Sequence, residues 1–338
     1  MASRRRLYLA AVATVGLFVV IQLGALSLID PFKQAGYQTV ENPSDPTNSV
    51  VYLVAILVAT GVILLVLKFG IDRLLRLLIV STCGLLSLYV FSVLIPPILI
   101  FQGLNVTPWA LAIGVAALLY LYPEWYVIDL AGIIIGAGGA GLFGISFGPL
   151  PAILLLSVLA IYDAVSVYGT EHMLTLAEGV TDLKLPLVLI IPVTLSYSFL
   201  DQDPIADRTP DEHGETNDPD DSSDDGTDQS TAPADGESFA HRDAFVIGLG
   251  DAVMPSVMVA SAAFFSPAPD LGIPGIAINL PALMAMIGTV VGVSILMWLV
   301  AKGRAHAGLP LLNGGAILGY LVGSLAAGVG LLPAIGVA

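Results

Sequence analysis

Charged side chains are scarce in this sequence, since Asp, Glu, Lys and Arg make up 12% of its 338 residues. A soluble domain of this length could not cover its surface with so few polar groups. The mean hydropathy is +0.89. Apolar stretches of about 20 residues recur along the chain, and a helix of that length crosses a bilayer. The composition therefore excludes an ordinary soluble fold and predicts a multi-pass membrane protein.

Cysteine is almost absent as well. Cys83 is the only one and lies inside an apolar run, so the chain can form neither an internal disulfide nor a cysteine-based metal site. The histidines, His172, His213, His241 and His306, are scattered over predicted loops without the spacing of metal ligands. No phosphate-binding glycine loop or basic patch is evident. We therefore expect no metal, no cofactor and no nucleic-acid partner.

The formal net charge of −15 comes almost entirely from one tract. Residues 201–237 contain 14 acidic residues and one basic residue. This tract is rich in Asp, Ser, Gly, Pro and Thr, and it has too few apolar residues to bury a core. It predicts a disordered loop over 200–242, which separates a first membrane region (1–199) from a second (243–338).

The remaining apolar stretches predict an all-α fold with nine transmembrane helices. The first follows three arginines, but it is long for a signal peptide and lacks a clear cleavage site. The segment 183–199 is short and contains two prolines, so we expect it to be extended and interfacial or protein-buried rather than a further crossing. The nine predicted spans are 7–29, 50–70, 74–101, 106–122, 126–147, 149–171, 243–265, 277–301 and 309–333.

The positive charges predict the orientation of these spans. If the N-terminus is cytoplasmic, eleven of the twelve Lys and Arg residues lie at or beside cytoplasmic ends, and Lys33 alone is outside. The sequence therefore predicts a cell-membrane protein whose N-terminus and acidic loop are cytoplasmic and whose C-terminus is outside.

Two acids lie deep within predicted spans, where ionisable groups are costly and usually functional. Asp163 is eight residues from the cytoplasmic end of the sixth span, and Asp251 is eight residues from the same end of the seventh. At the helical rise, both depths are about 12 Å. Two carboxyls at one depth on consecutive antiparallel spans can face each other.

Such a pair supports more than one function. Two close carboxyls in a low dielectric share a proton, so one can activate water while the other polarises a peptide carbonyl. That combination hydrolyses amides without a metal. A proton or cation relay, or a buried pair that only joins two helices, would place acids in the same way, so depth alone does not decide between them.

The sequence around the two acids is more specific. Asp163 follows Tyr162, and Asp251 follows Gly248, Leu249 and Gly250. A Tyr-Asp on one span and a Gly-Leu-Gly-Asp on the next resemble the GxGD intramembrane aspartyl proteases, the family of presenilin and signal peptide peptidase. The resemblance covers at least the sixth to ninth spans.

Membership of that family would imply that Asp163 and Asp251 are the catalytic pair. It would also imply that Tyr162, Gly248, Leu249 and Gly250 border the substrate, and that residues 185–199 form a short sheet with extended substrate. The family's Pro-Ala-Leu motif opens the last span. The literal match at 281–283 comes too early, so we assign the motif to Ala307, Gly308, Leu309 and Pro310. There the first proline and the alanine of the family pattern are replaced.

The predicted function is therefore an intramembrane aspartyl protease of presenilin type. Its expected partners are transmembrane peptide or protein substrates and the lipid bilayer; no obligatory subunits are expected, and the oligomeric state stays open. The main alternative is a proton- or cation-coupled transporter using the same acids, although no internal repeat is evident. A prepilin-type peptidase and a catalytically silent chaperone on the same scaffold are further alternatives.

Overall fold

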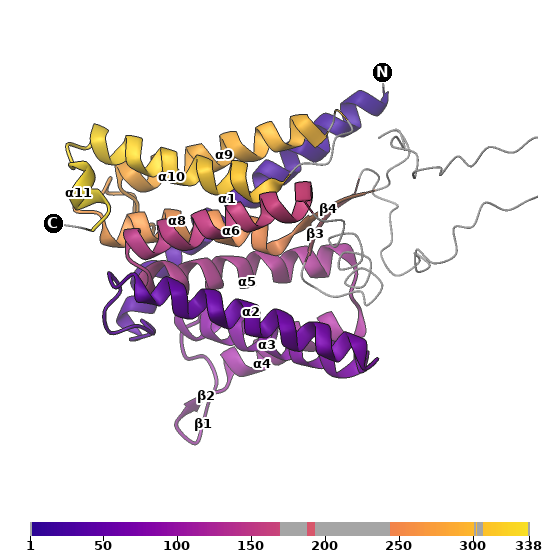
Figure 1. Cartoon of the computed structure of the whole chain (residues 1–338). Coiled ribbons are helices and arrows are strands. Elements are labelled where there is room, and N and C mark those ends of the chain that lie inside the picture. Colours follow the sequence, from indigo (N-terminus) through magenta and orange to yellow (C-terminus); the bar gives the residue numbers. More distant parts are fainter. Residues whose placement is uncertain (1, 170–187, 193–243, 301, 303–306, 337–338) are drawn as a thin grey trace, which may run out of the picture.

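The structure is a computed structural model that describes residues 2–169, 188–192, 244–300, 302 and 307–336 (Figure 1). Labels follow Figure 1. The acidic tract 200–242 lies outside the described residues, so the prediction of a disordered loop there stays a prediction.

Each of the nine predicted spans contains one apolar helix. Seven are long and apolar enough to cross a membrane, and α4 and α8 are shorter apolar helices. The helices that correspond to the predicted spans are α1 (Ala2–Gln34), α2 (Thr47–Lys68), α3 (Asp72–Leu94), α4 (Thr107–Leu121), α5 (Trp125–Ser146), α6 (Pro149–Gly169), α8 (Leu249–Phe265), α9 (Leu280–Val300) and α10 (Gly308–Ala326).

Three predicted span boundaries are wrong because the span extends six or seven residues beyond its helix. The third predicted span continues to 101, but α3 ends at Leu94, just before two prolines that cannot continue a helix. The chain then forms a hairpin of β1 (Ile100–Phe101) and β2 (Leu104–Asn105). The last predicted span continues to 333, but α10 ends at Ala326, before Gly328 with φ 78°, and a short α11 (Leu331–Ala334) follows.

The third wrong boundary concerns the seventh span. Its first residues form a strand, β4 (Ala244–Gly248), and the helix begins only at Leu249. β4 pairs antiparallel with β3 (Val188–Pro192), with Val188 opposite Gly248 and Pro192 opposite Ala244. β3 lies in the segment predicted to be extended, 183–199; the rest of that segment is outside the described residues. The part of the fold that the structure describes is therefore helical with two small two-stranded sheets.

The helices pack around α5. In Figure 1, α5, α6 and α8 lie between α2, α3 and α4 on one side and α9 and α10 on the other. α5 packs against both α1 and α8, and β3 lies against α5. The described core is formed by two adjoining clusters of buried aliphatic and aromatic side chains.

The closest helix pair is α9 with α10. A Cβ atom built on Gly288 would lie 2.0 Å from the Gly315 carbonyl oxygen, and one on Gly319 would lie 2.1 Å from the Met284 carbonyl oxygen. Glycines four residues apart on both helices, Gly288 and Gly292 on α9 and Gly315 and Gly319 on α10, allow this backbone contact. The contact holds α10, whose first turn carries Gly308 and Leu309, against α9.

Candidate active site

Asp163 lies in the last two turns of α6, and its side chain is 8% exposed. Its Oδ2 accepts a hydrogen bond of 3.0 Å from the backbone N–H of Leu309. The backbone N–H of Gly308 also donates toward this carboxylate. These are the first two residues of α10, whose N-cap Ala307 supplies no side-chain acceptor. The carboxylate of Asp163 therefore satisfies the free amides of a helix N-terminus, where negative charge is favoured.

Asp251 lies in the first turn of α8, directly after the end of β4. A Cβ atom built on Gly248 would lie 3.5 Å from Asp251 Oδ2, and one built on Gly308 would lie 3.7 Å from the same oxygen. The backbones of these two glycines therefore border the carboxylate. Asp251 and Asp163 are also close enough to interact electrostatically. Both acids thus meet at the start of α10.

The depth argument for Asp251 is partly wrong. It assumes helical geometry along the whole approach to the acid, whereas Ala244–Gly248 is a strand, which rises about 3.3 Å per residue instead of about 1.5 Å. The acids come together for a different reason: α6 ends, and α8 and α10 begin, at the same end of the bundle.

The other predicted site residues have different surroundings. Tyr162 is 58% exposed, and none of the described residues fills the space at Gly250, where a built Cβ atom would have no neighbour within 4 Å. Leu249 is instead buried, and its Cδ1 packs toward Gly136 of α5. Ala307 is buried, and its N–H donates to the Tyr168 hydroxyl at 3.4 Å. Pro310 lies in the first turn of α10, where a missing N–H costs least.

The literal Pro-Ala-Leu at 281–283 has a structural role at the other end of α9. The Asn279 Oδ1 accepts the N–H of Ala282 at 2.9 Å, and the Asn279 Nδ2 donates to the Ala262 carbonyl at 2.9 Å. These bonds join the start of α9 to the end of α8. The α9 residue beside Gly308 is Leu296, with its Cδ2 3.3 Å from a Cβ built on that glycine. Residues 281–283 are about four helical turns away from it.

Two residues near the site were not predicted. Tyr168 contacts Ala307 as described, and Asp129 of α5 accepts the N–H of Ile190 in β3 at 2.7 Å. Asp129 lies near the start of the fifth predicted span and did not stand out like the two deeper acids; its partner lies 61 residues away, and no sequence pattern links the two.

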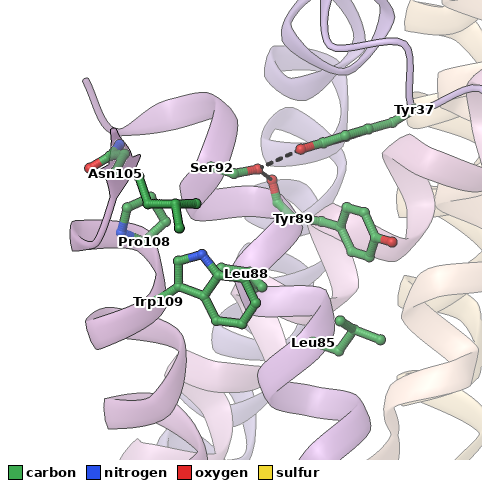
Figure 2. A pocket seen from close by; sticks show the side chains of 9 residues that line it. Tyr37, Leu85, Leu88, Tyr89, Ser92, Asn105, Pro108 and Trp109 are labelled. Carbon is green, nitrogen blue, oxygen red and sulfur yellow. Dashed lines mark hydrogen bonds between the residues drawn. The ribbon is translucent and has the colours of Figure 1, made fainter. Parts of the chain in front are cut away.

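A pocket of about 440 Å³ lies elsewhere, between the ends of α1 and α3 and the start of α4 (Figure 2). Tyr37, Tyr89 and Trp109 form much of its wall, and the Tyr37 and Ser92 hydroxyls are 3.0 Å apart. No acid lines it. In the part of the chain that the structure describes, no group of three His, Cys, Asp or Glu side chains could hold a metal ion.

Comparison with known proteins supports a family assignment. Residues 15–329 match the family described as signal-peptide peptidase, presenilin aspartyl protease. A solved presenilin-family intramembrane aspartate protease, crystallised in space group C222, is 32% identical, with a TM-score of 0.63 over 94% of this chain and 99% of that chain. A P2 crystal structure of a presenilin-family intramembrane aspartate protease is 32% identical with a TM-score of 0.60, over 93% and 97% of the two chains. A comparison with curated proteins gave no match.

The apolar helices and the two acids at one end of the bundle are typical of membrane proteins that hold a pair of carboxyl groups within the bilayer. Within that class, this chain belongs to the signal-peptide peptidase and presenilin family of aspartyl proteases.

Proposed function

We propose that this chain hydrolyses peptide bonds within transmembrane segments of membrane proteins, with Asp163 and Asp251 as the catalytic pair. The observation that carries the proposal is the convergence of both carboxylates on the first turn of α10. Membership of an aspartyl protease family supports the same reaction.

The chemistry requires the two acids to share one proton. The ionised carboxylate takes a proton from water, which attacks the peptide carbonyl, while the protonated one donates a hydrogen bond to the carbonyl oxygen. Because the pair titrates as a unit, neither acid is assigned as the permanent base. The amides of Gly308 and Leu309 at the start of α10 hold the orientation of the Asp163 carboxyl.

We further propose that substrate binds in an extended form along the β3–β4 sheet. β4 ends at Gly248, beside Asp251, so a strand added to this sheet would bring its backbone to the acids. Open space at Gly250, one residue before Asp251, leaves room for such a chain. The positive charges support a cytoplasmic N-terminus and site, with the C-terminus outside. We expect activity without partner subunits.

The test is incubation of the purified protein with a model transmembrane peptide, with and without an aspartyl-protease transition-state analogue. We expect products cut within the apolar segment, identified by mass, and their loss when the analogue is present. Intact peptide, together with proton or cation flux across proteoliposomes, would favour the transporter instead.

A second prediction concerns the motif at the start of α10. Leu309→Pro removes the N–H that binds Asp163, so we expect it to lower the cleavage rate at least about tenfold. Leu309→Ala keeps that N–H and should cost less. Leu283→Ala, in the literal Pro-Ala-Leu, is the matched control and should cleave at nearly the rate of the unmodified protein. A larger loss from Leu283→Ala than from Leu309→Pro would overturn the assignment of the motif to 307–310.

A further inference from the structure

The third intramembrane acid of this region, Asp129, lies in the second turn of α5 and has a defined partner. Its Oδ1 accepts the backbone N–H of Ile190 at 2.7 Å. Ile190 is fully buried at the centre of β3, so its N–H would otherwise have no water to bind. The bond attaches β3 to α5.

This bond also establishes which backbone groups of the sheet point outward. In an antiparallel pair, opposite residues alternate between those that bond to each other and those whose N–H and C=O point away. Because the Ile190 N–H points to Asp129, the pair Ile190 and Val246 belongs to the second kind. The same alternation makes Pro192 and Ala244 outward-pointing, and Pro192 has no N–H to satisfy. On the edge of β3 that lies along α5, neither Ile190 nor Pro192 therefore has an N–H left to pair with another strand.

The opposite edge of the sheet belongs to β4. By the same alternation, the N–H and C=O groups of Val246 and Gly248 point away from β3. Val246 is 52% exposed, and Gly248 borders Asp251. Among the described strands none pairs with this free edge of β4. The position along α5 at which β3 is held therefore sets the position of the free edge relative to Asp251.

We propose that Asp129 is a positioning residue for proteolysis: by binding the Ile190 N–H it fixes the β3–β4 sheet on α5, so that the free edge of β4 presents an extended substrate to Asp251 in one register. The inference rests on the proposed function. Asp129 acts here as a hydrogen-bond acceptor rather than through its charge, and it does not touch the reacting atoms.

The test compares Asp129→Ala, Asp129→Asn and Asp129→Glu in the full chain. Asn keeps an oxygen at the Oδ1 position, Ala removes it, and Glu keeps the charge but displaces the oxygen by one methylene. We expect Asp129→Asn to cleave a model transmembrane peptide within about threefold of the unmodified protein, at the same bond. Asp129→Ala and Asp129→Glu should be at least about tenfold slower and should spread cleavage over neighbouring bonds, which a general loss of stability would not do.

Hydrogen exchange at the amides of residues 188–191 provides a readout that does not depend on activity. We expect exchange there to be at least about tenfold faster in Asp129→Ala than in the unmodified protein, and nearly unchanged in Asp129→Asn. Binding of a transition-state analogue identifies folded variants. If Asp129→Ala is not folded, the comparison of Asp129→Asn with Asp129→Glu tests the proposal. Equal exchange in all folded variants, or a slow Asn variant beside an active Glu variant, would overturn the proposal. An unmodified protein that fails to cleave would instead refute the proposed function, while the exchange comparison still tests the attachment of β3.

Discussion

Asp163→Ala and Asp251→Ala are each expected to lower transmembrane-peptide cleavage by at least about 1,000-fold, because residues that act as one catalytic unit lose nearly all activity when either is removed. Each variant leaves one carboxyl, which can supply only one of the two roles that amide hydrolysis requires. Product formation followed by mass spectrometry measures the loss.

The asparagine variants separate chemistry from structure. Asp163 also binds the first turn of α10, so Asp163→Ala loses a helix cap as well as an acid. Asp163→Asn retains an acceptor oxygen for the Leu309 N–H but cannot take a proton from water. We expect Asp163→Asn to unfold at nearly the temperature of the unmodified protein and to be inactive. Asp30→Ala, at an exposed position of α1, is the matched control and should retain activity. Appreciable cleavage by both Asp163→Asn and Asp251→Asn would refute the assignment.

The second large effect is expected at the contact between α9 and α10. A Cβ atom built on Gly315 would lie 2.3 Å from the Gly288 carbonyl oxygen, so Gly315→Ala forces two backbones apart. Overpacking of this kind costs about 1–3 kcal/mol, and the apparent Tm should fall by roughly 2–4 °C. Since α10 carries Gly308 and Leu309, its displacement should also slow cleavage at least about tenfold.

Gly314→Ala is the control for this substitution. Gly314 is the preceding residue of the same helix, and a Cβ atom there would have no neighbour within 4 Å. Alanine is also the better helix former, so Gly314→Ala should unfold at the same temperature as the unmodified protein or slightly above it. Equal thermal stability of the two variants, measured in one detergent, would show that the close contact of α9 with α10 does not determine stability.

The helical membrane fold was predictable because apolar length is a strong local signal. The low density of charge and the recurrence of long apolar stretches located an apolar helix in each of the nine predicted spans, seven of them long enough to cross a membrane, and the helical membrane fold and the family are confirmed. The helix ends were less predictable. An apolar run such as Ala244–Gly248 reads equally well as the start of a helix, because periodicity does not separate a short buried strand from a helix. Its partner β3 lies more than 50 residues earlier, beyond the acidic tract.

The site was predictable only in part. Asp163 and Asp251 stood out because acids are rare within spans, and Gly308 and Leu309 stood out by their position before the last span. The role of Asp129 depends on a contact with Ile190 across 61 residues, which composition and spacing do not reveal. The glycines of α9 and α10 did carry a signal, since Gly288 and Gly292, like Gly315 and Gly319, are spaced for close helix packing.

The most direct test of the central claim is crosslinking between positions 163 and 251. Asp163→Cys and Asp251→Cys are combined with Cys83→Ser, which removes the only native cysteine, and treated with a bifunctional thiol reagent that has an ethylene spacer. Asp163→Cys with Asp30→Cys is the control pair, since Asp30 lies in the last turns of α1, at the end of the bundle where α6 begins. We expect the 163–251 pair to crosslink within one chain, and the control pair not to. Failure of the 163–251 pair to crosslink, while each cysteine still reacts with a monofunctional reagent, would contradict a shared catalytic site.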